Sequence, residues 1–258
     1  MTTDPCDLTG RVALITGAAS GQGRAASLLF AEHGADIAVA DINRGGADET
    51  VALVEKLGRR AVAIDADVSV RADCDAMVAA TVEGLGRLDI LYNNAAVQMS
   101  GTLAQATEDD WDRTIATNLS AIFYACRAAI PHMLAGGRGS IISTASVLGL
   151  IGSDGYVAYG AAKAGLVGLT QQIAVEFGPA VRANIIAPGS IDTPRFRKVA
   201  EEMDDTEGFL EGLARVIPVR RLGTADDVAG IALFLASDQS AYVSGAIVPA
   251  DGGLAAFR

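Results

Sequence analysis

Seven short apolar runs alternate with longer amphipathic stretches along this chain, and the alternation limits the folds that it can adopt. The apolar runs lie at 12–16, 37–40, 61–64, 90–93, 140–143, 182–187 and 246–248. Between them, apolar residues recur at helical spacing over 24–33, 44–57, 71–85, 108–134, 156–177 and 225–236. Strands separated by helices form βαβ crossovers, which make the strands parallel and cover both faces of the sheet. The sequence therefore predicts an α/β fold, a Rossmann-type doubly wound parallel sheet of about seven strands.

The length and net charge of the chain limit the number of domains and the kinds of partner that we expect. With 258 residues, 50% of them hydrophobic, the chain can bury one large core, so we expect a single domain over 1–258. The least regular region, at about 190–222, mixes turn residues with amphipathic pieces and is expected to form a substrate loop over the site. A net charge of −11 disfavours nucleic acids and anionic membranes as partners.

The cysteines, the histidines and the hydropathy of the chain argue against a metal site and a membrane-spanning segment. Three cysteines without CxxC spacing and a polar N-terminus favour a cytoplasmic location. No stretch approaches the roughly 18 continuous apolar residues of a membrane-spanning helix. The two histidines, His33 and His132, lie in no ligand motif, so we expect no metal site.

A glycine-rich turn follows the first predicted strand, where Gly17, Gly21 and Gly23 surround Ser20 and Gln22. Glycines allow a tight turn and a close approach of backbone N–H groups to a pyrophosphate, whose charge is favoured at a helix N-terminus. The spacing is GxxxGxG and not the common GxGxxG. Glycines needed only for the geometry of a strand-to-helix turn remain an alternative interpretation.

Asp41 ends the second predicted strand, at the position where an acid binds the adenosine ribose of a dinucleotide. A carboxylate there repels a 2′-phosphate, and neither Ser20 nor Ile42 supplies a cation for one. These residues predict NAD as the cofactor, with Arg44 as the nearest residue that could favour NADP. A turn or N-cap role for Asp41 remains open.

Tyr159 is the one tyrosine of five that is followed four residues later by a lysine, Lys163. On a helix these positions share a face. A neighbouring ammonium favours the phenolate, so we expect Lys163 to lower the pKa of Tyr159 from its usual value of about 10. A surface helix with a partly buried tyrosine and a solvated lysine is the alternative.

In combination, these residues resemble the short-chain dehydrogenase/reductase family over about 8–253. Ser146 precedes Tyr159 by thirteen residues, which is the separation found in that family. The motifs that carry the resemblance are the turn from Thr16 to Gly23, Asp67-Val68, Asn93-Asn94-Ala95-Ala96, Asn118, Ser146, Tyr159 with Lys163, Pro188-Gly189 with Ile191 and Thr193, and Asp251-Gly252-Gly253. Ala96, Ala145 and Gln22 depart from the usual pattern.

The resemblance implies an oxidoreductase that uses Tyr159 as general acid and base, with Lys163, Ser146 and Asn118 as the other catalytic residues. Ser146 would orient the substrate oxygen, and Asn118 would position a water that carries the proton onward. The implied cofactor-binding residues are Gly17, Ser20, Gly21, Gln22, Gly23, Asp41, Ile42, Asp67, Val68, Asn94, Ala95, Tyr159, Lys163, Pro188, Gly189, Ile191 and Thr193. A homotetramer, packed partly through 108–134 and 156–177, is implied as well.

The reaction expected from these residues is NAD-dependent interconversion of a secondary alcohol and a ketone. We expect an apolar pocket that suits an apolar or cyclic small molecule, formed after Ala96, within 147–156 and within 190–213. Its expected side chains are Leu148, Leu150, Ile151, Tyr156, Phe196, Met203 and Phe209. The sequence leaves open whether Arg195, Arg197 or Lys198 turns inward to meet a carboxylate, with solvated loop charges as the alternative. Two alternatives stay open: a 3-oxoacyl-(acyl carrier protein) reductase, which normally uses NADPH, and a dinucleotide-binding regulator without turnover.

Overall fold

A parallel sheet of seven strands forms the centre of the computed structural model, which describes residues 4–257. The strands are rich in alanine and β-branched residues, and most of them are buried on both faces, as expected for a covered parallel sheet. Their order is β3-β2-β1-β4-β5-β6-β9. They are β1 (Val12–Thr16), β2 (Asp36–Asp41), β3 (Ala61–Asp65), β4 (Ile90–Asn93), β5 (Gly139–Thr144), β6 (Val181–Pro188) and β9 (Ile247–Ala250).

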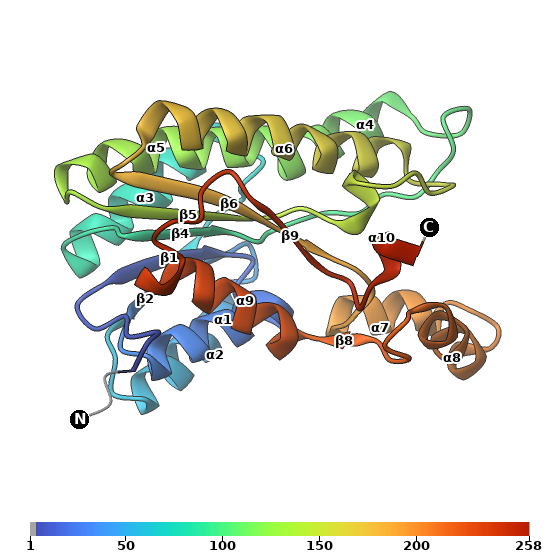
Figure 1. The fold of residues 1–258 in the computed structure, drawn as a ribbon, viewed down its shortest axis with the longest axis horizontal. Helices are drawn as coiled ribbons and strands as arrows, with labels where there is room; N and C mark the ends of the chain where they lie inside the picture. Colours follow the sequence, from blue (N-terminus) through green and yellow to red (C-terminus); the bar gives the residue numbers. More distant parts are fainter. Residues whose placement is uncertain (1–3, 258) are drawn as a thin grey trace.

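Helices cover both faces of this sheet (Figure 1). One layer contains α1 (Gly21–Glu32), α2 (Arg44–Lys56) and α9 (Ala225–Ala236), and the opposite layer contains α3 (Arg71–Leu85), α5 (Ala121–Ala135) and α6 (Val157–Phe177). Each layer packs against its face of the sheet in a separate hydrophobic core. The predicted doubly wound α/β fold with about seven strands is confirmed.

The strand order reverses its direction between β1 and β4. From β1 the chain builds outward through β2 and β3, and it then returns to place β4 on the other side of β1. At such a reversal the loops after adjacent strands leave toward opposite faces and open a crevice at the carboxyl ends of the strands. The glycine turn after β1 and the loop after β4 therefore flank one crevice.

The stretch expected to be one helix over 108–134 is interrupted. It consists of α4 (Glu108–Ile115), a π-helical turn (Ala116–Ser120) and α5. Thr107 and Asp110 begin α4 with a capping box in which each side chain accepts a hydrogen bond from the backbone of the other residue. Single π turns within helices are frequent at functional sites, and this one contains Asn118.

The region 190–222 is more regular than its sequence indicates. It contains β7 (Ile191–Asp192), α7 (Pro194–Glu201) and α8 (Thr206–Val216), and β7 pairs with β8 (Gly223–Thr224). In Figure 1, α7 and α8 lie together at one end of the molecule. The last strand, β9, tolerates Pro249 because it pairs with β6 alone and is an edge strand. No helix within residues 4–257 is long and apolar enough to cross a bilayer.

Candidate active site

One cleft of about 830 Å³ opens at the carboxyl ends of the strands and collects most of the predicted site residues. Its volume lies within the usual range for sites that hold small molecules and cofactors. All predicted catalytic and cofactor-binding residues line it except Gly23, Asn118 and Lys163, which are buried behind its wall. The members that line it are Gly17, Ser20, Gly21, Gln22, Asp41, Ile42, Asp67, Val68, Asn94, Ala95, Ser146, Tyr159, Pro188, Gly189, Ile191 and Thr193.

The glycine turn is packed too tightly for side chains. Helix α1 begins at Gly21, three residues earlier than predicted, so the N–H groups of its first turn face the cleft end of β1. A Cβ on Gly23 would lie 2.3 Å from the carbonyl oxygen of Gly17, and one on Gly17 would lie 2.8 Å from Cα of Ala95. This close backbone packing beside free helix N–H groups fits a pyrophosphate.

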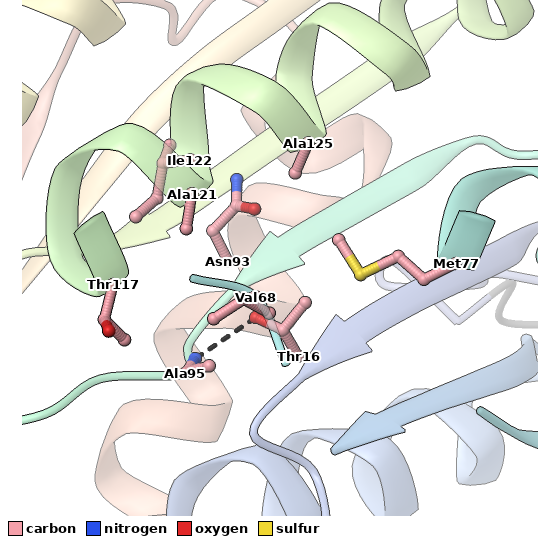
Figure 2. A pocket seen from close by; sticks show the side chains of 9 residues that line it. All are labelled: Thr16, Val68, Met77, Asn93, Ala95, Thr117, Ala121, Ile122 and Ala125. Atoms are coloured by element: carbon pink, nitrogen blue, oxygen red, sulfur yellow. Dashed lines mark hydrogen bonds between the residues drawn. The ribbon is translucent and has the colours of Figure 1, made fainter. Parts of the chain in front are cut away.

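Thr16 and Asn94 fix the turn to the loop after β4. The hydroxyl of Thr16 accepts hydrogen bonds from the backbone N–H groups of Asn94 (3.0 Å) and Ala95 (3.1 Å), and Figure 2 shows the second of these. The side-chain amide of Asn94 donates to the carbonyl oxygens of Thr16 (3.1 Å) and Gly17 (3.2 Å). The amide nitrogen of Asn94 therefore holds the turn itself. The small cavity in Figure 2, about 10 Å³, has room for no more than about one water molecule.

Acidic side chains line the end of the cleft near β2 and β3. Asp41 accepts hydrogen bonds from the backbone N–H groups of Ala19 and Asn43, both at 2.9 Å. The turn role considered for Asp41 is therefore present, and each carboxylate oxygen still has a lone pair that could accept a hydrogen bond from a ribose hydroxyl. Asp67 lies beside it in the cleft wall and accepts from the backbone and hydroxyl of Ser69.

Tyr159 and Lys163 lie on the same side of α6, as their spacing predicts. The Nζ atom of Lys163 is 5.6 Å from the centre of the Tyr159 ring and donates to the carbonyl oxygen of Thr144 at 2.7 Å. Lys163 is 1% exposed. Burial lowers the pKa of Lys163 to about 7, and the like charge of Arg195 contributes to the lowering.

The expected lowering of the Tyr159 pKa by Lys163 is wrong. Burial raises the pKa of Tyr159, because a phenolate is poorly solvated there, and this effect outweighs the lowering caused by Arg195 and by a hydrogen bond with Ser146. Burial thus favours the neutral form of both members of the pair. A phenol with a raised pKa is protonated at neutral pH and suited to donate a proton.

Ser146 and Asn118 both hold backbone groups near Tyr159. The hydroxyl oxygen of Ser146 accepts a hydrogen bond from the backbone N–H of Leu148 at 3.1 Å, which caps a short 3-10 turn and leaves its proton free to donate. Asn118 is fully buried and bonds both backbone groups of Val97, accepting from its N–H at 3.2 Å and donating to its carbonyl oxygen at 2.8 Å. The π turn is thereby connected to the loop after β4.

The substrate end of the cleft is less apolar than expected. Tyr156, Phe196, Met203 and Phe209 line it, but Leu148, Leu150 and Ile151 do not. Those three residues follow Ser146 in a turn that packs on α6, where a Cβ on Gly149 would lie 2.8 Å from the backbone of Lys163. Arg113, Arg195 and Glu202 also line the cleft, and none of them is among the site residues predicted from the sequence.

Comparison with known proteins identifies the family of this chain. The family described as "Enoyl-(Acyl carrier protein) reductase" matches residues 17–255. The 3-oxoacyl-[acyl-carrier-protein] reductase FabG of Thermotoga maritima is 40% identical over 96% of this chain and 98% of its own. The 2,5-dichloro-2,5-cyclohexadiene-1,4-diol dehydrogenase LinX of Sphingobium indicum is 38% identical over 95% of this chain and 96% of its own. The crystal structure of levodione reductase has a TM-score of 0.93 and 35% identity, covering 97% of this chain and 99% of that one.

The fold and these relatives define an oxidoreductase built on a Rossmann-type sheet. The chain belongs to the short-chain dehydrogenase/reductase family, whose members bind a nicotinamide dinucleotide.

Proposed function

We propose that this protein is an NAD-dependent oxidoreductase that interconverts a secondary alcohol and a ketone. The observation that carries the proposal is the shared cleft, which is lined by Tyr159 and Ser146 at one end and by Asp41 at the other. The glycine turn and Asp41 would hold the nicotinamide dinucleotide, which when bound would supply hydride transfer to or from the reacting carbon. The chain's own residues handle the remaining proton and the position of the substrate oxygen.

Tyr159 is the group we propose for the proton transfer. In ketone reduction its hydroxyl donates a proton to the substrate oxygen, and in alcohol oxidation its phenolate takes that proton back. The hydroxyl of Ser146 donates a hydrogen bond to the same oxygen and stabilises the charge that develops on it. Lys163, with its pKa near 7, can pass the proton onward, and Asn118 fixes the loop behind the pair.

A Tyr159→Phe variant tests the reaction. We expect turnover to fall by about 10²–10⁴-fold, the usual contribution of a general acid or base, with the NADH dissociation constant unchanged. The measurement is NADH formation or consumption across a panel of cyclic, aromatic, steroidal and sugar-derived secondary alcohols and their ketones. Tight NADH binding by the wild-type protein with no turnover of any panel member would instead support a dinucleotide-binding regulator.

Preference for NAD over NADP is supported by the charges around the adenosine end. Asp41 lines the cleft there, whereas Arg24 and Arg44 form ion pairs with Glu49 and Asp48 at 2.9 Å and do not line it. A 2′-phosphate would therefore meet a carboxylate and no unpaired arginine from these positions.

An Asp41→Ala variant tests the cofactor preference. We expect the ratio of kcat/KM for NAD to that for NADP to fall by about tenfold, which corresponds to about 1.4 kcal/mol. Asp65→Ala is the matched control, because Asp65 lies opposite Asp41 in the register of β2 and β3 but is exposed outside the cleft. A wild-type preference for NADPH would refute the assignment and favour the 3-oxoacyl-(acyl carrier protein) reductase, an activity carried in the name of the 40% identical relative.

For assembly we propose a homotetramer packed through α4, α5 and α6. Large apolar side chains remain exposed on these helices, among them Trp111 (42%), Phe123 (47%) and Val175 (80%). Such exposure on a single chain is typical of surfaces that pack against another subunit. The three cysteines are free, which suits the cytoplasmic location we propose. Light scattering after size-exclusion chromatography measures the subunit number.

A further inference from the structure

Arg195, the second residue of α7, reaches across the substrate end of the cleft. Its Nη1 atom donates a hydrogen bond to the carbonyl oxygen of Ala96 at 2.8 Å, so the guanidinium connects α7 with the loop after β4. Both of these segments line the cleft that contains Tyr159. The guanidinium group has five N–H donors, and this contact uses one of them.

No carboxylate of the described residues forms an ion pair with Arg195. Its neighbour Arg197 pairs with Asp192, and Arg221 pairs with Asp227, so the same region supplies acids to other arginines. The whole chain carries 31 acidic residues against 20 basic ones. An arginine that faces a binding cleft without a carboxylate partner in such an acidic chain has donors available for a ligand.

The charge of Arg195 acts on the reacting groups themselves. Burial raises the pKa of Tyr159, and Arg195 lowers it. Burial also lowers the pKa of Lys163, and Arg195 lowers it further. The geometry agrees with this influence, because Arg195 and Tyr159 line the same cleft and the hydrogen bond to Ala96 holds the guanidinium at its substrate end. An anion bound by Arg195 would therefore share this end of the cleft with the reacting carbon.

A second arginine lines the same part of the cleft from the opposite layer. Arg113 lies in α4, one helical turn before Thr117, and both residues face the cleft. Figure 1 places α4 and α7 in different layers at the same end of the sheet. Arg113 also forms no ion pair within residues 4–257. Two arginines from separate elements thus border the substrate end.

Two of the three acids that line the cleft lie away from its substrate end. Asp41 and Asp67 are at the ends of β2 and β3, on the adenosine side of the sheet. The third, Glu202, lines the substrate end and follows Arg195 by seven residues, about two helical turns or 10 Å along α7. With two arginines against this one glutamate, the substrate end carries an excess of positive charge within a protein whose net charge is −11. Such a local field attracts anions and raises their concentration in the cleft.

We propose that the substrate carries a carboxylate close to its secondary alcohol or ketone, and that Arg195 binds this carboxylate. The inference rests on the proposed function and specifies its substrate class, a hydroxy acid or keto acid. The planar guanidinium binds a carboxylate through two parallel N–H bonds, which also fixes the orientation of the neighbouring carbon. Tyr159 and Ser146 then meet the carbonyl or hydroxyl oxygen. Arg113 attracts the anion from the other side of the opening.

Matched pairs of keto acids and their methyl esters test the proposal. Acetoacetate, 4-oxopentanoate and 3-oxocyclohexanecarboxylate are each compared with their ester, using NADH and NADPH in parallel. The wild-type enzyme should prefer at least one acid to its ester. Arg195→Gln should lower kcat/KM for that acid by about 10–100-fold, the range expected for charge-assisted hydrogen bonds, and for the ester by less than about threefold.

Two further variants distinguish carboxylate binding by Arg195 from a general effect of losing a positive charge or of disturbing α7. Arg197→Gln removes the same charge from the same helix, but its partner is Asp192 outside the reacting centre, so activity on both acid and ester should be retained. Arg195→Lys keeps a charge without the planar fork and should give an intermediate loss on the acid. Equal losses on acid and ester in Arg195→Gln, accompanied by an upward shift of the pH profile, would overturn the proposal and leave Arg195 as a residue that only tunes Tyr159.

A binding measurement tests the carboxylate site separately from the proposed reaction. The acid and the ester are titrated by calorimetry into two NADH-saturated proteins, Tyr159→Phe and the double variant Tyr159→Phe with Arg195→Gln. Because neither protein turns the substrate over, the titration measures binding alone. Binding of the acid that requires Arg195, without turnover by the parent enzyme, would sustain the carboxylate site and refute the proposed reaction. Turnover of neutral ketones by the parent enzyme, with no binding of the acid to either variant, would support the proposed reaction and refute the carboxylate site.

Discussion

Gly23→Ala is the most direct test of the glycine turn as a pyrophosphate site. The added Cβ would lie 2.3 Å from the carbonyl oxygen of Gly17, 2.8 Å from Cα of Ala18 and 2.8 Å from the side-chain nitrogen of Asn94. These distances fall well short of the about 3.5–4.0 Å at which non-bonded atoms normally rest. Two of the three atoms belong to the backbone, and the third, on Asn94, is held by its hydrogen bonds to the carbonyl oxygens of Thr16 and Gly17, so none of them can move aside easily.

The cost of this contact can be worked from its geometry. Overpacking of this kind typically destabilises a protein by about 1–3 kcal/mol, and alanine returns up to about 1 kcal/mol through its better helix propensity. At about 2–4 °C per kcal/mol for a domain of this size, we expect the melting temperature to fall by several degrees. If the strain is relieved by opening the turn, the dissociation constant of NADH rises by about 10–100-fold, equivalent to about 1.4–2.7 kcal/mol.

The assay is thermal unfolding together with NADH fluorescence titration, with Gly230→Ala as the matched control. Gly230 lies within α9, outside the proposed subunit contacts, and a Cβ added to it would meet no atom within 4 Å, so the same substitution should stabilise the helix by about 0.5–1 kcal/mol. Equal NADH affinity and equal melting temperatures in the two variants would refute the reasoning, because the close packing around Gly23 would then have no consequence.

Two further predictions concern buried charges. Asp89→Asn should destabilise the protein by about 1–3 kcal/mol in urea unfolding at pH 7, since Asp89 is 3% exposed and accepts from Arg87, Arg138 and the N–H of Val12. The two arginines left without this partner are 42% and 45% exposed and stay hydrated. Burial raises the pKa of Asp89, but these hydrogen bonds outweigh burial and leave the pKa lowered. The stability that Asp89 contributes is therefore present above about pH 4 and is lost on acidification. A variant whose stability falls with acid in the same way as that of the wild type would contradict this prediction. Between about pH 7 and 10.5, the unfolded chain holds a proton on Lys163 that the folded chain has released, so the free energy of unfolding should depend on pH. Lys163→Met should remove this dependence. Wild-type stability should rise relative to the variant by up to about 1.4 kcal/mol per pH unit there, and a constant difference would show that Lys163 stays charged.

The sheet could be predicted from the sequence because its signals are local. Runs of alanine and β-branched residues between helical patterns identify buried parallel strands, and the observed strand boundaries differ from the predicted ones by at most two residues. The π turn within 108–134 could not be predicted in this way. Residues 116–120 contain neither glycine nor proline, and Asn118 instead bonds the backbone of Val97 in a loop 21 residues away.

The substrate end of the cleft is harder to predict from the sequence than the cofactor end. The glycine turn and Asp41 follow strands whose positions are fixed by the sheet, so their sequence places them at one edge. Arg113 and Arg195 come from two different layers, and the hydrogen bond that holds Arg195 connects residues 99 positions apart in the sequence. Because no periodic pattern encodes such a contact, the sequence does not show which of Arg195, Arg197 and Lys198 turns into the cleft.

The error in the pKa of Tyr159 has the same origin as the correct prediction of its position. The i, i+4 rule describes distance along a helix, and it places Lys163 beside Tyr159 as observed. It contains nothing about burial, which comes from the packing of α6 against the sheet and lowers the pKa of the very ammonium that was expected to act on the phenol. The positive charge that lowers the pKa of Tyr159 is instead that of Arg195, from the region 190–222. The helix that we propose binds the substrate thus also contributes to the electrostatics of the proposed proton donor, so a substitution at Arg195 that changes substrate specificity should alter the pH dependence of the reaction as well.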